Sequence, residues 1–533
     1  MKPFVAPVED ILFTLTHVAG ARELPRWDVE FVSEVAGHFA AFAEGEIAPL
    51  DESGDLEGCT LTEGRVAMPA GFKDLYRSYA EQGWPGLTIP EEFGGQGMGA
   101  MMLAITSEIF SGANHSMQMV TGLVPGAART LLRFGTTDQQ ARYLPSLASG
   151  ETLATMCLTE PGAGSDLSRV RCRAIPDGDS WQISGEKIFI SGGDQDMSDQ
   201  ILHLVLARTS DNGIKGLSLF LCPCTRRDGS RNGVTVTRIE EKMGLHASPT
   251  CQLAFDGAGA ELIGAEGQGL MAMFTMMNHA RADVALQGVA HAARAHDVAS
   301  SYAAERQQGR GADGRPVALD GHADVRRMLD EIDAAALGAR AIAHLAFVTM
   351  ERGDTPDLVE FLTPLAKVSG TEAGIRGAEL GMQVLGGYGY LREYRLEQTY
   401  RDARICAIYE GANGIHERML ATRLLGGASA EAFATFLAGE SAGEVAAALE
   451  GWHAARQILL RQDDPAPFAH EFYLLTRDTL LTAVWHRIEA SAPHHSQPER
   501  LIRVARAQLT ALAVRRAGDL TLLSARVKNL AHA

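Results

Sequence analysis

The stretch that decides the fold of this 533-residue chain is CLTEPGAGSD, residues 157–166. It gathers hydroxyl, carboxylate and glycine residues, a combination that lets backbone N–H groups approach a ligand closely. Before it, from about residue 28, apolar residues recur at spacings of three and four, which predicts helices. After it, to about residue 260, short apolar runs alternate with glycine and aspartate turns, which predicts a small antiparallel β domain.

Helical periodicity returns after Gly269. The segment 281–308 contains no proline and is rich in alanine, with Gly288 as its single interior glycine. Small residues of this kind let neighbouring helices of a bundle approach closely. A stretch rich in glycine and alanine near 426–447 is expected to be a connection. Three further helices, separated by prolines, are expected at about 444–462, 468–491 and 498–530.

Composition and charge exclude several classes of protein. The formal net charge of −18 argues against a nucleic-acid partner, which needs cationic patches. The seven cysteines form no CxxC pair, and no histidines are spaced as metal ligands, so we expect reduced thiols and no metal. The N-terminus lacks a secretory apolar region, and no stretch approaches the roughly 18 apolar residues of a membrane span. We therefore expect a cytoplasmic protein.

Three further motifs could carry chemistry. GEKIFISGG, residues 185–193, puts an aromatic ring and a hydroxyl at the end of a strand, where a flat ring system could stack, although a core Phe is the simpler interpretation. QVLGGYGY, residues 383–390, has glycines where a helix should end. YEGANGIH, residues 409–416, follows RDAR at 401–404.

In this order and spacing, these segments resemble the acyl-CoA dehydrogenase flavoprotein family, over about residues 30–425. A narrower resemblance points to the methylthiopropionyl-CoA dehydrogenase branch, which carries a helical C-terminal extension. The stretches that carry this narrower resemblance are APVEDILF (6–13), the run 196–208, MGLHASPTC (243–251) and MFTMMN (273–278).

The resemblance implies a mainly α fold with a central β domain. Its segments would be a helical N-terminal domain (1–155), an antiparallel β domain (156–268), a four-helix bundle (269–428) and a helical extension (429–533). It also implies noncovalent FAD, held between the domains and across the interface of a homodimer or homotetramer. The implied reaction is α,β-desaturation of an acyl-CoA, with electrons passed to an electron-transferring flavoprotein.

Two alternatives on the same scaffold stay open. One is a flavin oxidase or monooxygenase. The other is a DNA-associated stress protein with vestigial dehydrogenase activity, which would need a basic surface at the C-terminus. The last predicted helix carries several arginines that could contribute to such a surface, Arg500, Arg503, Arg506, Arg515 and Arg516. We expect these arginines to form a solvated or dimer-facing side of that helix.

By the resemblance, Glu410 is the catalytic carboxylate and Gly411 leaves room for substrate beside it. A pocket that excludes water would raise the pKa of this carboxylate and suit it to a carbon acid. The thioester carbonyl would accept hydrogen bonds from the Glu410 N–H and a flavin hydroxyl. The alternative is a solvated loop glutamate without a task.

The resemblance also implies the residues that bind cofactor and substrate. Those for FAD are Leu158, Thr159, Gly164, Ser165, Phe189, Ile190, Ser191, Arg306 (toward the neighbouring subunit's FAD), Gln383, Gly386, Gly387, Ala412 and Asn413. Those for the acyl-CoA are Ser165, Asn278, Arg281 and Gly411.

Several positions depart from the family pattern or carry a second interpretation. Phe189 stands where tryptophan is usual, and Ala412 where threonine is usual. His416 replaces a glutamine and is expected at the surface or the FAD edge. Arg281 could form a structural salt bridge instead of approaching CoA. The methionine-rich stretch 271–277 could line an acyl pocket, although buried core is the simpler assignment.

Overall fold

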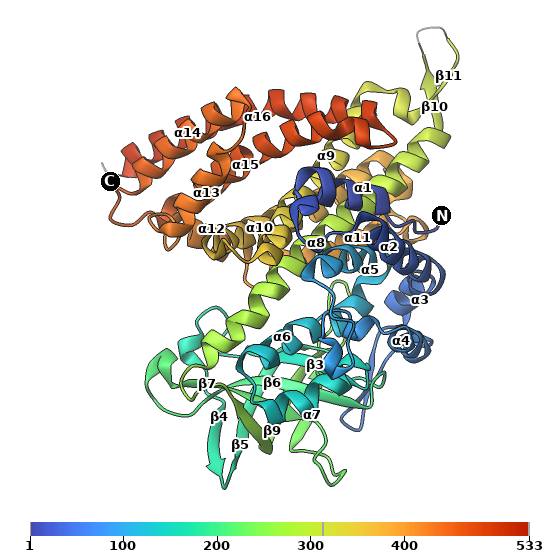
Figure 1. Ribbon diagram of the computed structural model, residues 1–533. Coiled ribbons are helices and arrows are strands. Elements are labelled where there is room, and N and C mark those ends of the chain that lie inside the picture. The colour runs from blue at the N-terminus through green and yellow to red at the C-terminus, as the bar shows by residue number, and fades with distance from the viewer. Residues whose placement is uncertain (1, 312–313, 531–533) are drawn as a thin grey trace. The chain divides into compact units, whose positions relative to one another are not determined.

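The chain forms two compact units in the computed structural model, which describes residues 2–311 and 314–530. Unit 1 consists of residues 1–41, 104–112 and 281–533, and unit 2 of residues 42–103 and 113–280. Their helices and strands are labelled in Figure 1. Each unit combines stretches that are distant in the chain, whereas the sequence predicts four consecutive domains. That division into four domains remains a prediction.

Unit 2 contains the main sheet. Its strands are β3 Thr152–Cys157, β4 Arg173–Asp177, β5 Ser180–Ser191, β6 Gln200–Arg208, β7 Leu217–Pro223, β8 Val234–Ile239 and β9 Thr250–Ile263. The order is β3-β6-β4-β5-β9-β7, with β8 on β9. Because β7 also pairs with β6, the strands β6, β4, β5, β9 and β7 form a closed ring. The ring is closed by a short contact, because β4 pairs with β6 only through Arg173 and Arg208.

The pairing in this sheet is mostly antiparallel, as expected, but β6 has two parallel neighbours, β4 at a single residue pair and β3 over a longer run. β3 runs parallel to β6, with Thr152 opposite Gln200 and Cys157 opposite Val205. A parallel pair needs a long crossover between its strands, and here β4 and β5 lie between them in the chain. Alternation of apolar and polar residues does not reveal the direction of a neighbouring strand, so the sequence could not show this.

One histidine, His203, is buried in the core of the sheet. His203, in the middle of β6, is 1% exposed, and its Nδ1 lies 2.7 Å from Thr155 Oγ1 on β3. Burial lowers its pKa to about 3. His203 is therefore a neutral, hydrogen-bonded core residue, as the sequence suggested.

The helices of unit 2 flank the sheet. α6 (Val124–Phe134) and α7 (Thr137–Ala148) pack against β3 (Figure 1). The start of α7 is fixed by a capping box of Thr136 and Gln139. The other α-helices and strands wholly in this unit are α3 Pro49–Glu57, α4 Phe72–Glu81, β1 Thr60–Thr62 and β2 Arg65–Ala67. Three helices run through both units, α2 Val29–Phe42, α5 Ala100–Thr121 and α8 Gly269–Glu305.

Unit 1 is a helical body. Its first helices are α1 Val8–Phe13, α9 Ala323–Arg352, α10 Pro356–Leu385, α11 Leu396–Cys406 and α12 Asn413–Ala421. The expected close approach of helices is confirmed at Gly288 of α8, where a Cβ would lie 2.2 Å from the carbonyl oxygen of Gly370 on α10. Only glycine lets the two backbones meet at this distance.

One helix among the described residues, α9, is long and apolar enough to cross a membrane by length and composition. Its most apolar stretch is 94% buried inside the protein. That burial is typical of a core helix, because a membrane-spanning helix exposes an apolar surface to lipid.

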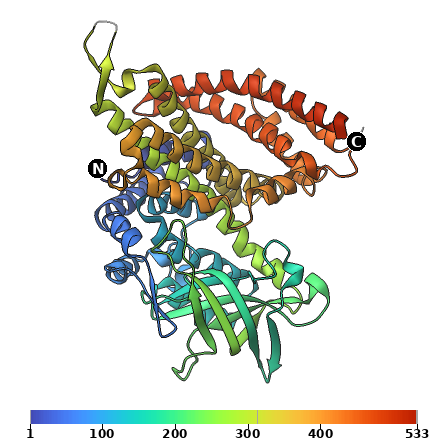
Figure 2. The same ribbon diagram turned by 180° about the vertical axis from the view of Figure 1, so that it is seen from behind.

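The C-terminal part of unit 1 is a layer of helices, which Figure 2 shows from behind. They are α13 Ala428–Ala438, α14 Gly443–Leu459, α15 Ala469–Ser491 and α16 Pro498–Leu530. The last three match the helices expected from the sequence. The expected connection at 426–447 is wrong, because α13 occupies much of it. Phe433 of this helix stacks on Phe361 of α10, with ring centroids 4.6 Å apart, and such apolar burial stabilises a helix of small residues.

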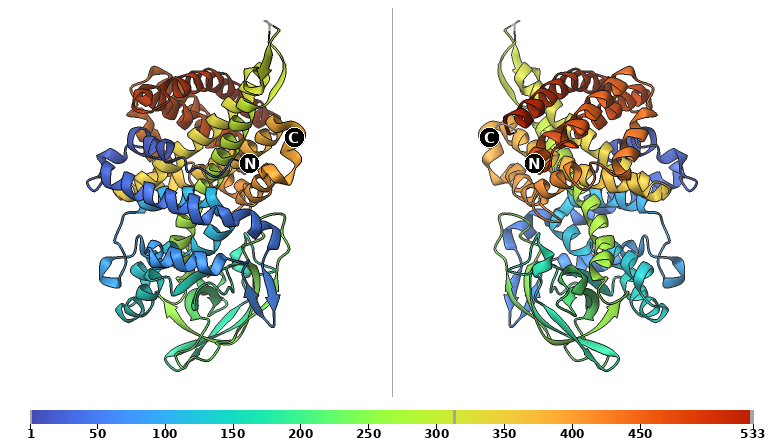
Figure 3. Two further views of the ribbon diagram at one scale, coloured as in Figure 1. Left: turned by 90° about the vertical axis from the view of Figure 1, so that its right-hand side faces the viewer. Right: turned by 90° about the vertical axis from the view of Figure 1, so that its left-hand side faces the viewer.

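Between α8 and α9 the chain forms the hairpin of β10 (Gln307–Arg310) and β11 (Pro316–Ala318). It extends away from the helices of unit 1 (Figure 3). The sequence did not indicate this hairpin, because its two strands have only four and three residues and the first has no apolar side chain.

Candidate active site

The turn between α11 and α12 holds Glu410 in an unusual conformation. Glu410 has φ of 52° and Gly411 a φ of 93°. A non-glycine residue in this left-handed region is uncommon, and such residues cluster at functional sites. The backbone of this turn is therefore strained and must be held by its surroundings. Its conformation sets the direction of the Glu410 side chain.

The Glu410 carboxyl group is desolvated. Its Oε2 atom is buried and has no hydrogen-bond partner within the described residues. Burial raises the pKa of Glu410 to about 7, against the opposing effect of Arg281 and Lys367. An oxygen without a partner in a desolvated setting can accept a proton from a substrate near neutral pH.

The backbone carbonyls of this turn are held from three helices. Lys367 on α10 donates from Nζ to the Gly411 carbonyl (2.8 Å), and Arg281 on α8 donates from Nε to the Glu410 carbonyl (3.3 Å). His416 Nε2 on α12 lies 3.1 Å from the same Glu410 carbonyl. Among the described residues, no acceptor takes the Glu410 backbone N–H, which leaves this donor for a ligand.

Behind the turn lies a polar network within unit 1. The Tyr409 hydroxyl donates to the Gln287 side-chain oxygen, and Gln287 Nε2 donates to Asp283 Oδ2 at 3.0 Å. Ser107 donates to the other oxygen of Asp283. These bonds connect the catalytic turn to α8 and α5 and limit its freedom to move.

A second set of predicted site residues lies at the end of α10. The glycines Gly386 and Gly387 follow the last residue of α10, and a Cβ on either would meet no atom within 4 Å. Gln383 and both glycines are exposed. The Arg306 guanidinium, at the end of α8, lies 5.7 Å from the centre of the Tyr388 ring beside them. The structure thus brings Arg306 to the segment 383–390.

Unit 2 holds the segment 157–166 against β5 through a buried ion pair. Lys187 is 0% exposed and donates from Nζ to Glu160 Oε1 (2.8 Å) and to the Leu158 carbonyl (3.0 Å). Glu160 also accepts the backbone N–H groups of Arg171 and Cys172. This pair fixes the path of the backbone at Leu158 and Thr159.

Phe189 breaks the regular register of β5. It has φ of 59° and is 60% exposed, and the pairing of β5 with β9 shifts register between Lys187 and Ile190. A bulge re-aims a side chain in this way. Phe189 is therefore no core residue, whereas its neighbour Ile190 is 2% exposed and belongs to the core.

The other predicted residues of unit 2 lie at its surface. Gly164 and Ser165 are in an exposed loop, and a Cβ on Gly164 would meet no atom within 4 Å. Ser191 pairs with Thr250 at the end of β5. Asn278 is exposed on α8.

Three comparisons with known proteins identify the chain. Family models of the acyl-CoA dehydrogenase N-terminal, middle and C-terminal domains match residues 33–151, 155–258 and 267–425. The chain belongs to the acyl-CoA dehydrogenase family. It is accordingly an FAD-dependent oxidoreductase that acts on the CH–CH group of an acyl-CoA, as the resemblance implied.

The relatives agree with this assignment. The chain is 39% identical to the 3-methylmercaptopropionyl-CoA dehydrogenase of Ruegeria pomeroyi, over 86% of this chain and 82% of that protein. It is 33% identical to the broad-specificity linear acyl-CoA dehydrogenase FadE5 of Mycobacterium tuberculosis, over 78% and 74%. An acyl-CoA dehydrogenase of Bacillus anthracis, solved with FAD, covers 94% of this chain with a TM-score of 0.76, and at 21% identity it supports the fold alone.

The structure corrects or refines three expectations for this dehydrogenase. His416 is not at the surface, because it is 1% exposed and burial lowers its pKa to about 3. Arg281 lies at the Glu410 turn, so it has a structural contact there whatever its role toward CoA. The stretch 271–277 is divided, with Met273 and Met276 fully buried and Met271 exposed.

The arginines of α16 are engaged with this chain's own groups. Arg500 pairs with Asp333 and Asp10, Arg503 with Asp330, and Arg515 with Asp478. Arg506 pairs with Glu489, and Arg516 donates to Thr482. They therefore do not form the free basic surface that a DNA-associated protein would need.

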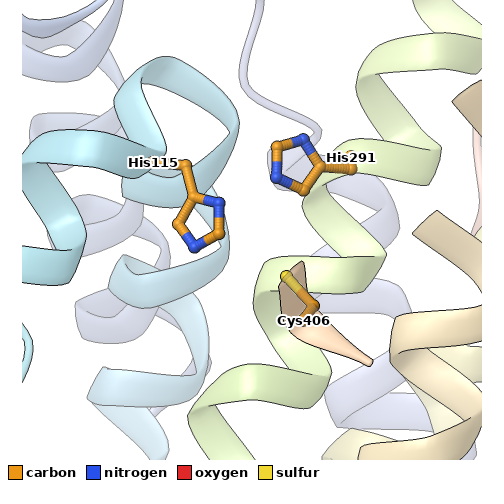
Figure 4. Close-up of side chains that lie close together, drawn as sticks. All are labelled: His115, His291 and Cys406. Carbon is orange, nitrogen blue, oxygen red and sulfur yellow. The ribbon is translucent and has the colours of Figure 1, made fainter. Parts of the chain in front are cut away.

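Among the described residues, the cysteines and buried histidines form no group of three metal ligands within one unit. All seven cysteines are free. Figure 4 shows His291 on α8 and Cys406 at the end of α11, whose ligand atoms lie within 4.8 Å of one another, while His115 belongs to unit 2. Two ligands fall short of the three or four that a protein zinc site uses.

Sequence reasoning missed two buried lysines, Lys187 and Lys367. Each stands in an apolar run, KIFI for the first and PLAKVSG for the second. Because burying an unpaired ammonium group is costly, a lysine within such a run implies a partner. That signal was available but did not name the partners, which lie 27 and 44 residues away along the chain.

Proposed function

We propose that Glu410 is the base that removes the α-proton of the acyl-CoA thioester. The observation that carries this proposal is the buried Glu410 Oε2, which has no hydrogen-bond partner within the described residues. Its pKa, raised to about 7, matches a base that works near neutral pH. The Glu410 N–H, which the described residues leave without an acceptor, would donate to the thioester carbonyl and stabilise enolate character.

The residues present in each unit fit FAD. In unit 2 the exposed ring of Phe189 offers a stacking surface, and a ligand could approach the backbone at Gly164. In unit 1 it could approach the backbone at Gly386 and Gly387. Residues that would hold the cofactor are Leu158, Thr159, Gly164, Ser165, Phe189, Ser191, Arg306, Gln383, Gly386, Gly387, Ala412 and Asn413. FAD, when bound, accepts the hydride that leaves the β-carbon. Ile190 would contribute through packing, because its side chain is buried.

The roles toward substrate and partners complete the proposal. Gly411 would leave room for the acyl chain, Arg281 and Asn278 would approach the CoA portion, and Ser165 its phosphates. Electrons would pass to an electron-transferring flavoprotein. We place the enzyme in the cytoplasm, as a homodimer or homotetramer in which Arg306 reaches the FAD of the neighbouring subunit.

The proposal is tested by mixing the purified holoenzyme anaerobically with acyl-CoAs and recording the flavin absorbance. The panel contains short and long linear chains and a 3-methylthio-substituted propionyl-CoA, because the relatives named above act on such thioesters. We expect bleaching by one class of chain, and a loss of about 10²–10⁴-fold in its rate for Glu410→Gln. The matched control is Glu450→Gln, an exposed glutamate on α14. Equal bleaching by Glu410→Gln and wild type would remove Glu410 as the base.

The electron acceptor is tested with the reduced enzyme. Rapid reoxidation by an electron-transferring flavoprotein, with slow reoxidation by oxygen, is the expected result. Rapid reoxidation by oxygen alone would favour an oxidase instead.

A further inference from the structure

We propose that Lys367 is the positioning residue of the catalytic turn, which anchors the Gly411 carbonyl and the Asn413 side chain and holds a positive charge beside Glu410. This inference rests on the proposed function of Glu410. Lys367 would touch neither substrate nor flavin and would act through the glutamate.

Lys367 is buried, and its ammonium group makes two hydrogen bonds to the turn. Its side chain is 0% exposed, in the middle of α10. Nζ donates to the Gly411 carbonyl at 2.8 Å and to Asn413 Oδ1 at 3.0 Å. Thr371, one turn further along α10, lies 3.1 Å from Asn413 Nδ2. The two residues that flank Ala412 are thus tied to α10, one by its carbonyl and one by its side chain.

This anchoring opposes the strain of the turn. Glu410 and Gly411 both have positive φ, and a glutamate in that region is held only if its surroundings over-determine the conformation. Without Lys367, the Gly411 carbonyl would lose the donor that lies 2.8 Å from it, and the turn would be free to relax. The Glu410 side chain would then lose its fixed direction.

The charge of Lys367 acts on the same carboxylate. The charged groups that influence Glu410 are Arg281 and Lys367, which lower its pKa, and Asp283, which raises it. Burial lowers the pKa of Lys367 itself to about 8, so it remains mostly protonated at pH 7, with Cys406, Glu410 and Arg281 as its other electrostatic neighbours. His416, the remaining titratable group at the turn, is neutral near pH 7 because burial lowers its pKa to about 3.

The test is the pH dependence of anaerobic flavin reduction by the best acyl-CoA, measured with holoenzyme. In Lys367→Met, Glu410 loses a neighbouring cation, so the midpoint of the pH profile should rise by about one pH unit or more. In Lys367→Arg, which keeps the charge, the midpoint should stay near that of wild type while the rate falls, because a guanidinium does not fit the same contacts. Thr371→Val loosens the Asn413 contact without changing charge and should leave the midpoint in place.

Each outcome decides the proposal. An unchanged midpoint in Lys367→Met, with a rate lowered equally at every pH, would show a purely structural lysine and overturn it. If Lys367→Met fails to retain flavin, a midpoint in Lys367→Arg that rises by a full unit would overturn it equally. Glu410→Gln separates the two hypotheses, because flavin reduction at wild-type rate in that variant would remove the proposed function itself.

Discussion

Glu108 on α5 and Arg340 on α9 form a fully buried ion pair. Arg340 Nε donates to Glu108 Oε1 at 2.9 Å, and its terminal nitrogen donates to the same oxygen at 2.8 Å, with both residues 1% exposed. Asp10 lies 3.8 Å from the guanidinium and is also bound by His495 and Arg500. This network ties the N-terminal segment and the C-terminal helices to the bundle of unit 1.

The first prediction concerns this pair. Arg340→Met should lower the free energy of unfolding by about 3–5 kcal/mol, because it leaves a buried carboxylate without its partner. The double variant Glu108→Gln with Arg340→Met should recover part of the loss. Denaturant unfolding followed by circular dichroism gives both values. Arg327→Ala, which removes an exposed pair with Asp324, should cost about 0–1 kcal/mol, and an equal cost for both arginines would contradict the prediction.

Glu410 should make stability depend on pH in a particular direction. Its folded-state pKa is raised from 4.5 to about 7, so the folded protein holds a proton that the unfolded chain has lost between those values. Stability should therefore fall as pH rises from about 4.5 to 7.

Glu410→Gln removes this effect. It should stabilise the flavin-free protein by about 1–3 kcal/mol at pH 8 and by much less at pH 4.5. Thermal unfolding at the two pH values is the measurement. The same gain at both values would mean that the carboxyl group does not titrate as described.

Helix packing at Gly288 gives a third prediction. Gly288→Ala would put a methyl group 2.2 Å from the Gly370 carbonyl, so α8 and α10 would have to separate, at a cost of about 3 kcal/mol or more. Gly451→Ala is the matched control, because Gly451 lies inside α14 and a Cβ there meets nothing within 4 Å. It should stabilise by about 0.5–1 kcal/mol. Thermal unfolding of both variants distinguishes a steric clash from an effect of helix propensity. Stability changes of the same sign in the two variants would contradict a clash at Gly288.

Phe189 should matter for cofactor binding more than for folding. Because its ring is 60% exposed, Phe189→Ala should change the stability of the flavin-free protein by about 0.5 kcal/mol or less. Loss of a stacking ring should weaken FAD binding by about tenfold. Titration of the flavin-free protein with FAD measures this. Phe31→Ala, which removes another exposed ring on α2, should leave the affinity unchanged, and equal affinities for all three proteins would remove Phe189 from the site.

The sequence by itself determined the order of helical and β segments and the bounds of the last three helices. The three C-terminal helices begin and end within a few residues of their predicted limits, because prolines and apolar periodicity are local signals. The small residues of 281–308 predicted a close helix contact, but the sequence did not show that Gly288 makes it with Gly370. Residues 428–438 were missed although their alanines favour a helix, because the glycines on either side of them, at 426–427, 439 and 443, indicated a connection.

The tertiary structure alone decided what surrounds the catalytic turn. The sequence singled out Glu410 but could not show that Arg281 and His416 contact its carbonyl and Lys367 the carbonyl of Gly411, because the three residues come from different helices. It could not show that Phe189 points outward, since a bulge depends on the partner strand. The pKa of Glu410 likewise depends on burial and on the charges of Arg281, Lys367 and Asp283, which only the packed helices bring together. Helices and turns depend on residues that are close together in the sequence, so the sequence predicts them. Desolvation and charge proximity depend on residues that are distant in the chain, so only the folded structure determines them.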